Sequence, residues 1–158
     1  MTGTEFLRRI YELEDGLACK EDEIRKIQAD MIHLKSVDTS RDRVDGGQPL
    51  DMADKVARLM EVEESLNRDW DTLIKWREVA RDMIGRMLTD QNRIVLMTRI
   101  VNHRSWKRVA GVLNKSEDYV RHLYPVAVAE FEARVAEEYP GYLDSVDFPG
   151  EKTQNNRE

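Results

Sequence analysis

The chain has 158 residues and a net charge of −6, with 41% hydrophobic and 35% charged residues. This length allows one or two small domains. No segment is apolar over the roughly 18 residues that a membrane-spanning helix needs, and the N-terminus lacks the apolar core of a signal peptide. We therefore expect a cytoplasmic protein without a membrane partner. Cys19 is the single cysteine, which excludes an intrachain disulfide and a cysteine-based zinc site.

Charge is distributed unevenly along the chain. Residues 1–88 hold 15 Lys/Arg and 20 Asp/Glu, residues 89–125 hold 7 and 3, and residues 126–158 hold 3 and 8. The three net charges are −5, +4 and −5. Because screening limits the reach of one charge to about 8 Å at physiological salt, the central segment can attract phosphates although the whole chain is acidic. We expect the acidic remainder to be a solvated scaffold.

Two long amphipathic patterns occupy residues 1–88. Apolar residues from Phe6 to Leu34 alternate at spacings of three and four, interrupted only by Lys20, which places them on one stripe of a helix. The polar segment 36–49 contains paired glycines and no periodicity, which predicts a mobile loop. A second helix follows, with Pro49 in its first turn and with Glu63 and Arg77 as polar interruptions. Its stripe comprises Met52, Val56, Leu59, Leu66, Trp70, Leu73, Ala80, Ile84 and Met87.

Helices of this length need partners, because a small globular core cannot bury a helix on the order of 55 Å long. An antiparallel helical hairpin, coiled-coil-like over 1–88, is the simplest arrangement. The second helix carries further apolar residues, namely Met60, Ile74, Trp76 and Met83. These residues offer a surface to a second copy, so a homodimer through the long helices is a candidate assembly.

Residues 89–139 are predicted to form shorter helices. Thr89 or Asp90 is suited to cap the first of them, and a corner follows at Asn102 and His103. The next stretch, SWKRVAGVLNKSEDYVRHLYP from Ser105 to Pro125, predicts two helices joined by a tight turn.

The residue types in that stretch have the spacing of a helix-turn-helix. Ser105 and Ser116 are good N-caps. Ala110 is small enough for two helices to approach closely, and Asn114 tolerates the left-handed conformation that the turn requires. The inward-facing residues are predicted to be Trp106, Val109, Ala110 and Leu113 on the first helix and Val120 and Leu123 on the second. The fold class is therefore all-α: the helical hairpin of 1–88 followed by a helix-turn-helix domain at 89–139.

Pro125 lacks a backbone N–H and clashes with the preceding turn, so we expect the second helix of the motif to kink or end there. A last helix would then leave from Val126 at a new angle and end near Pro140. The segment 140–158 has too few apolar residues to stay ordered and is predicted to be a disordered tail.

The N-terminal half of a recognition helix enters the major groove, where Arg donates to guanine and Asp or Glu accepts from cytosine. The candidate base-reading residues are Ser116, Glu117, Asp118, Arg121 and His122. The candidate phosphate contacts are Arg99, Arg104, Lys107, Arg108, Lys115 and Tyr119. Acids in a first turn also stabilise the helix dipole whatever the function, so both interpretations of Glu117 and Asp118 stay open.

The sequence NRIVLMTRIVNHRSWKRVAGVLNKSEDYVRHLYPVAVAEF resembles the fourth conserved region of sigma factors, which recognises a promoter element. The order of elements over roughly residues 5–135 resembles the phage-encoded ArpU-type late-gene transcription regulators. The resemblance implies a sigma region-4-like helix-turn-helix whose base-reading positions are Glu117, Asp118 and His122, with Arg121 beside them. Two acids stand where sigma factors commonly have a basic residue followed by an acid, and Pro125 also departs from their pattern.

The expected function is that of a sequence-specific DNA-binding transcription regulator of phage or prophage origin, which activates late genes and has double-stranded DNA as its partner. RNA polymerase is a further candidate partner. The alternatives are a DNA-packaging component resembling a small terminase subunit, and a polymerase-binding adaptor. No enzyme, metal or cofactor is expected, because His33, His103 and His122 lie on separate elements without carboxylates at metal-ligand spacing, and no glycine-rich phosphate loop is present.

Overall fold

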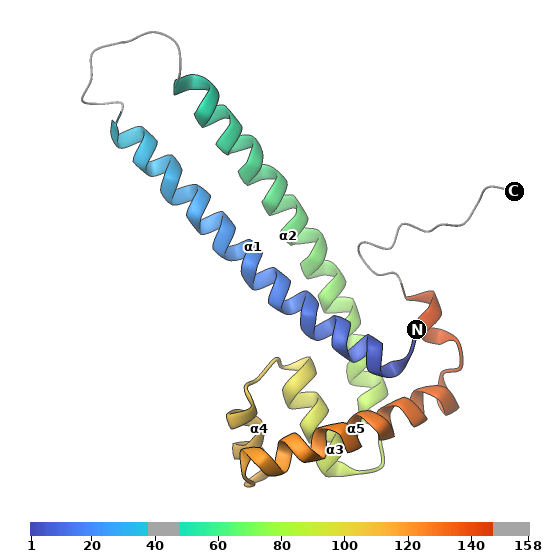
Figure 1. Cartoon of the computed structure of the whole chain (residues 1–158). Helices are drawn as coiled ribbons and strands as arrows, with labels where there is room; N and C mark the ends of the chain where they lie inside the picture. Colours follow the sequence, from blue (N-terminus) through green and yellow to red (C-terminus); the bar gives the residue numbers. More distant parts are fainter. Residues whose placement is uncertain (38–47, 147–158) are drawn as a thin grey trace, which may run out of the picture. The chain divides into compact units, whose positions relative to one another are not determined.

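The computed structural model describes residues 1–37 and 48–146, with only the backbone described for residues 37 and 48–51. These residues form helices and no strand, as expected for an all-α fold with a long N-terminal helix pair (Figure 1). In chain order the elements are α1 (Gly3–Val37), α2 (Gln48–Gly85), α3 (Asp90–Leu96), the π-helical turn η1 (Met97–Val101), α4 (Trp106–Leu113), α5 (Glu117–Glu138) and the 3-10 turn η2 (Tyr142–Ser145). None of the described helices is long and apolar enough to span a bilayer.

The chain divides into two compact units. Residues 15–71 form one, which we call the hairpin unit, and residues 1–14 together with the chain from residue 72 onward form the other, which we call the main unit. Both units therefore contain residues of both long helices. Of the predicted loop 36–49, residues 38–47 lie outside the described residues, whereas 36–37 belong to α1 and 48–49 to α2.

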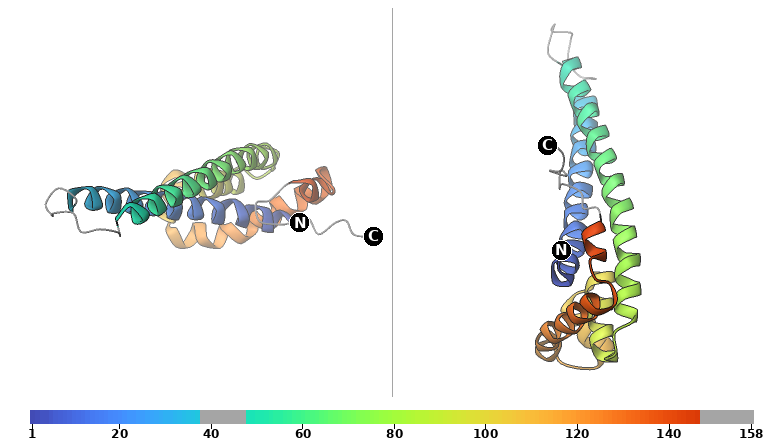
Figure 2. Two further views of the ribbon diagram at one scale, coloured as in Figure 1. Left: turned by 90° about the horizontal axis from the view of Figure 1, so that it is seen from above. Right: turned by 90° about the vertical axis from the view of Figure 1, so that its right-hand side faces the viewer.

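In the hairpin unit, α1 and α2 run antiparallel, side by side (Figure 2). Ion pairs join the helices, and the residue number of the partner on α2 falls as α1 advances. Lys20 Nζ lies 2.5 Å from Asp69 Oδ2, Glu23 Oε1 lies 2.7 Å from Arg58 Nη2, and Asp30 Oδ2 lies 3.5 Å from Lys55 Nζ. Lys20 interrupts the apolar stripe because it faces a carboxylate on the other helix.

These ion pairs also explain a wrong prediction about Val56. Val56 was assigned to the packing stripe, but its side chain is 38% exposed. The inward positions belong instead to the half-buried Lys55 and to Val62, which is 5% exposed. Lys55 reaches its partner from a position next to Val56, so the apolar side chain is turned outward.

We expect Asp69→Ala to destabilise the protein by about 1–2 kcal/mol, because Lys20 would keep its charge in a partly buried place without a carboxylate. The side chains of the pair are only 30% and 16% exposed. Replacing both Lys20 and Asp69 with leucine should restore the stability or exceed it, because apolar side chains suit the surrounding stripe. Urea unfolding of the three proteins measures this. A double variant with a lower free energy of unfolding than Asp69→Ala would contradict this explanation.

The prediction that Trp76 and Met83 belong to a surplus surface is also wrong. Their side chains are 4% and 2% exposed, because both pack in the core of the main unit. The other two residues of that set, Met60 and Ile74, are 65% and 50% exposed. Arg77, an interruption in the second stripe, is held inside the same unit by an ion pair with Glu14.

The core of the main unit combines both ends of the chain. Its fully buried large side chains come from the start of α1, the end of α2, α3 with η1, and α4 and α5; they include Phe6, Leu7, Ile10, Leu73, Ile84, Leu96, Ile100 and Phe131. The corner predicted after η1 is present, with His103 in the left-handed region at φ 47°. It redirects the chain from η1 into α4.

The expectation that the second helix kinks or ends at Pro125, with a separate helix from Val126, is corrected in one respect. α5 is one helix of 22 residues that runs through Pro125 (Figure 1). Pro125 itself is exposed, and its ring leaves only the carbonyl of Arg121 without an intrahelical donor. Burial of Val120, Ala127, Phe131 and Val135 along α5 holds the helix together across the proline.

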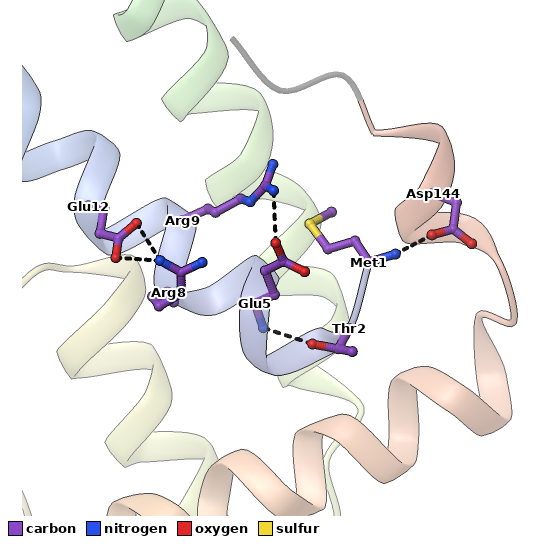
Figure 3. A network of polar contacts seen from close by, with 7 residues as sticks. All are labelled: Met1, Thr2, Glu5, Arg8, Arg9, Glu12 and Asp144. Carbon is purple, nitrogen blue, oxygen red and sulfur yellow. Dashed lines mark hydrogen bonds and ion pairs between the residues drawn. The ribbon is translucent and has the colours of Figure 1, made fainter. Parts of the chain in front are cut away.

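The disorder expected from residue 140 is likewise corrected for residues 140–146. Tyr142–Ser145 form η2 within this segment, and Leu143 is 3% exposed. Figure 3 shows the amino group of Met1 directed at the carboxylate of Asp144, with which it forms an ion pair. At the start of α1, Thr2 Oγ1 accepts a hydrogen bond from Glu5 N at 3.1 Å. Residues 147–158 of the predicted tail lie outside the described residues.

Candidate nucleic-acid interface

The turn between α4 and α5 has the capping that its sequence predicts. Ser105 Oγ accepts from Arg108 N at 3.3 Å, and Ser116 Oγ accepts from Tyr119 N at 3.1 Å. Between the helices, Asn114 adopts the left-handed conformation with φ 52° and ψ 47°. The following backbone N–H, that of Lys115, donates to the carbonyl of Ala110 at 3.0 Å. One residue in the left-handed region thus closes α4 and sends the chain into α5.

A small apolar cluster fixes the two helices against α3. Its buried members are Val95, Val109, Ala110 and Val120, with Trp106, Leu113, Leu123 and Tyr124 partly buried around them. The predicted inward-facing residues of both helices are therefore all at least partly buried. Ala110 is only 6% exposed, which agrees with the need for a small side chain where two helices approach closely.

We expect Asn114→Ala to destabilise the main unit by about 1 kcal/mol, because alanine pays the steric cost of the left-handed conformation. Asn114→Gly should be close to neutral, since glycine adopts that conformation freely and loses only backbone entropy. Thermal unfolding followed by circular dichroism measures both. An equal loss of stability in the two variants would show that the asparagine side chain, and not the backbone conformation, stabilises the turn.

The start of α3 is held by a residue that the sequence patterns did not reveal. Thr89 occupies the N-cap position, but its side chain makes no capping hydrogen bond. Instead the carboxylate of Glu130 on α5 accepts from Leu88 N at 2.8 Å, Thr89 N at 3.0 Å and Asn92 Nδ2 at 2.6 Å. Burial alone would raise the pKa of Glu130, but the hydrogen bonds from Asn92, Thr89 and Leu88 outweigh it and lower that pKa.

A second glutamate on α5, Glu132, accepts hydrogen bonds from the first turn of α1. Glu132 Oε2 accepts from Thr4 N at 2.6 Å and from Thr4 Oγ1 at 3.1 Å. The two other glutamates in the later part of α5, Glu137 and Glu138, pair with Arg134. The acids of α5 beyond residue 126 therefore make contacts within the unit, although Glu137 and Glu138 are also exposed to solvent, as expected of an acidic scaffold.

The predicted base-reading residues lie on the exposed first turns of α5. The side chain of Ser116 accepts the N-capping hydrogen bond, and Glu117 and Asp118 are the acids of the first turn. Arg121 Nη2 lies 3.8 Å from Glu117 Oε2, which is too long for a hydrogen bond. His122 Nδ1 lies 2.6 Å from the carbonyl oxygen of Asp118. The structure thus brings all five residues to one helix end.

Four of the predicted phosphate contacts share one property. They are exposed cations on α4 or beside it that form no ion pair with any carboxylate in the described part of the chain: Arg104, Lys107, Arg108 and Lys115. Lys115 Nζ lies 5.4 Å from the ring centroid of Tyr119. The hydroxyl of Tyr119 donates to Gln91 Oε1 at 3.1 Å, so α3 holds that ring. These four charges are available to an anionic partner.

Arg99, the sixth predicted phosphate contact, has a different setting. Its guanidinium carbon lies 4.5 Å from the ring centroid of Tyr11 and 4.6 Å from that of Trp106. Its Nη1 also donates to the carbonyl oxygen of Arg104 at 2.8 Å. The side chain of Arg99 therefore lies beside Arg104, but its guanidinium is occupied by contacts within the unit.

Within residues 1–37 and 48–146, no group of three or more His, Cys, Asp or Glu side chains is placed to hold a metal ion. No protein-family model, curated protein or solved structure matches the chain. The candidate interface is the surface formed by α4, the start of α5 and the turn between them.

Proposed function

We propose that this protein is a sequence-specific DNA-binding transcription regulator of the phage late-gene activator type. α4, the turn at Asn114 and the first half of α5 act as a sigma region-4-like helix-turn-helix. One observation carries the proposal: the exposed start of α5 lies next to four cations that have no acidic partner in the described part of the chain. Exposed cations also occur along α1 and α2, but these four lie together on α4 and beside the turn that leads into α5.

The chemistry of each group supports a division of roles. Lys and Arg bind phosphates by charge and position the protein without reading sequence. Arg104, Lys107, Arg108 and Lys115 have this role. Side chains at the start of a recognition helix reach base edges in the major groove, where Arg121 donates to guanine and Glu117 or Asp118 accepts from the amino group of cytosine.

The acidic balance of the chain does not oppose this role. The four glutamates in the later part of α5 accept hydrogen bonds from backbone amides or pair with Arg134, so their carboxylates are engaged within the unit. Their charges are also screened over about 8 Å at physiological salt. A local basic face is therefore compatible with a net charge of −6.

Selection from a random double-stranded DNA library tests the proposal. We expect the protein to enrich a defined sequence, and to bind that duplex at least about a thousandfold more tightly than an unrelated duplex of equal length. Both affinities should fall as salt rises. Equal affinity for the two duplexes would overturn sequence-specific recognition. No binding at low salt would overturn DNA binding and favour the polymerase-binding adaptor.

The mass of the protein in solution separates regulation from DNA packaging. Light scattering of the full chain should give a monomer or a dimer. A ring of eight or more chains would favour a packaging component resembling a small terminase subunit. This measurement does not depend on knowing the DNA target.

A further inference from the structure

Four side chains of the main unit form a continuous stack of rings and guanidinium groups. Tyr11 comes from α1, Arg99 from η1, Trp106 from the first turn of α4, and Arg121 from α5. Arg99 lies between the two rings, 4.5 Å from the centroid of Tyr11 and 4.6 Å from that of Trp106. The guanidinium of Arg121 lies 5.3 Å from the centroid of Trp106. The stack therefore connects α1 to the exposed face of α5.

The ring of Trp106 is fixed on several sides. It is partly buried against the apolar cluster of Val95, Val109 and Val120. The ring of Tyr124 meets it edge-on, with centroids 5.3 Å apart and planes at 86°. Arg99 is itself anchored by its hydrogen bond to the carbonyl of Arg104. Because the face of an indole ring attracts cations, Trp106 is a rigid support for a guanidinium.

Within the described residues, the Arg121 side chain contacts the Trp106 ring and has no hydrogen bond to a carboxylate. The nearest carboxylate oxygen, on Glu117, is 3.8 Å away, and the side chain of Arg121 is 53% exposed. A free arginine side chain loses much rotamer freedom when it binds, so holding it beforehand favours binding. Its planar guanidinium stacks on an aromatic ring in a way that the ammonium of lysine does not.

We propose that Trp106 is a positioning residue that holds the Arg121 guanidinium ready for contact with a base edge, and that Arg99, held by Tyr11, helps to fix the same ring. This inference rests on the proposed DNA-binding function and adds to it a determinant of specificity outside α5. It also gives Arg99 a role in the stack in place of a phosphate contact.

The test compares base preferences across variants, each measured by selection from the random duplex library. Arg121→Ala should lose the preference at one base pair, with about tenfold weaker binding of the enriched duplex. Trp106→Leu should lose the preference at that same base pair and keep the others. Trp106→Phe should retain it, because an aromatic face remains. The matched control is Lys107→Ala, which should weaken binding to all sequences alike.

A uniform loss of affinity in Trp106→Leu, with the preference at that base pair intact, would overturn the inference while leaving DNA binding in place. Because Trp106 is partly buried, Arg121→Lys supplies a second variant at an exposed site. It should keep the salt dependence and lose the base preference, and full retention of that preference would also overturn the inference.

The stack is also testable in the free protein, whatever its DNA target. The NMR signal of the Arg121 Nε–H group should carry a ring-current shift that Trp106→Leu removes and Trp106→Phe partly preserves. An unchanged signal in Trp106→Leu would refute the stack itself. Failure of the wild type to enrich any sequence would instead refute the proposed function, so the two failures are distinguishable.

Discussion

A variant with Arg104, Lys107, Arg108 and Lys115 all replaced by glutamine should bind the enriched duplex on the order of a thousandfold more weakly at physiological salt. Each phosphate contact releases about one counterion, so removing four should lower the slope of log affinity against log salt by about 3.6. None of the four side chains forms an ion pair in the described part of the chain, so the folded state loses little. Fluorescence anisotropy with labelled duplex at several salt concentrations measures both quantities.

The control for this variant carries the same change in charge elsewhere. Lys26, Lys35, Lys75 and Arg81 are also exposed, and they belong to α1 and α2 and not to α4, α5 or the turn between them. Replacing these four with glutamine should leave the salt slope nearly unchanged. If both variants lost affinity equally, net charge and not a defined face would govern DNA binding. If neither variant lost affinity, the phosphate contacts would have to lie on other residues.

Most of the turn between α4 and α5 could be predicted from sequence, because its determinants are local. Ser105 and Ser116 cap helices through backbone groups three residues away. The left-handed conformation of Asn114 satisfies a steric requirement of the turn itself. The polar interruptions in the long helices carried information as well. Lys20 and Arg77 broke the apolar stripes because each faces a carboxylate, on Asp69 and Glu14.

The features that could not be predicted depend on residues far apart in the chain. Glu130 reaches the backbone of Leu88 and Thr89 across 42 and 41 positions, and no local spacing encodes that contact. The pairing of Arg99 with Tyr11 is equally remote, so Arg99 was grouped with the exposed cations by charge alone. The prediction that the helix could end at Pro125 was wrong for a different reason. The rule behind that prediction describes an isolated helix, whereas burial of Phe131 and its neighbours sustains α5 beyond Pro125.

Glu130→Gln should destabilise the protein by about 2 kcal/mol, a large loss for the exchange of one polar side chain on α5. The carboxylate serves three donors at once, on Leu88, Thr89 and Asn92. Glutamine replaces one acceptor oxygen with an amide group that cannot accept. A fall of about 4–8 °C in the melting temperature would correspond to this loss. The matched control is Glu137→Gln on the same helix, whose 71% exposed carboxylate pairs only with Arg134 and should cost less than about 0.5 kcal/mol.

The effect of Glu130→Gln should depend on pH in a direction that follows from the lowered pKa of Glu130. Its ionised form contributes stability that is complete above the unfolded pKa of about 4.5 and is lost as pH falls through the lower folded pKa. Glutamine does not titrate, so the gap in unfolding free energy between wild type and variant should be constant near neutral pH and narrow below pH 4.5. Urea unfolding at pH 7, 5 and 3 measures the gap. A gap that widened on acidification would mean that Glu130 is protonated in the folded state, and α3 would then be held at its start by something other than a carboxylate.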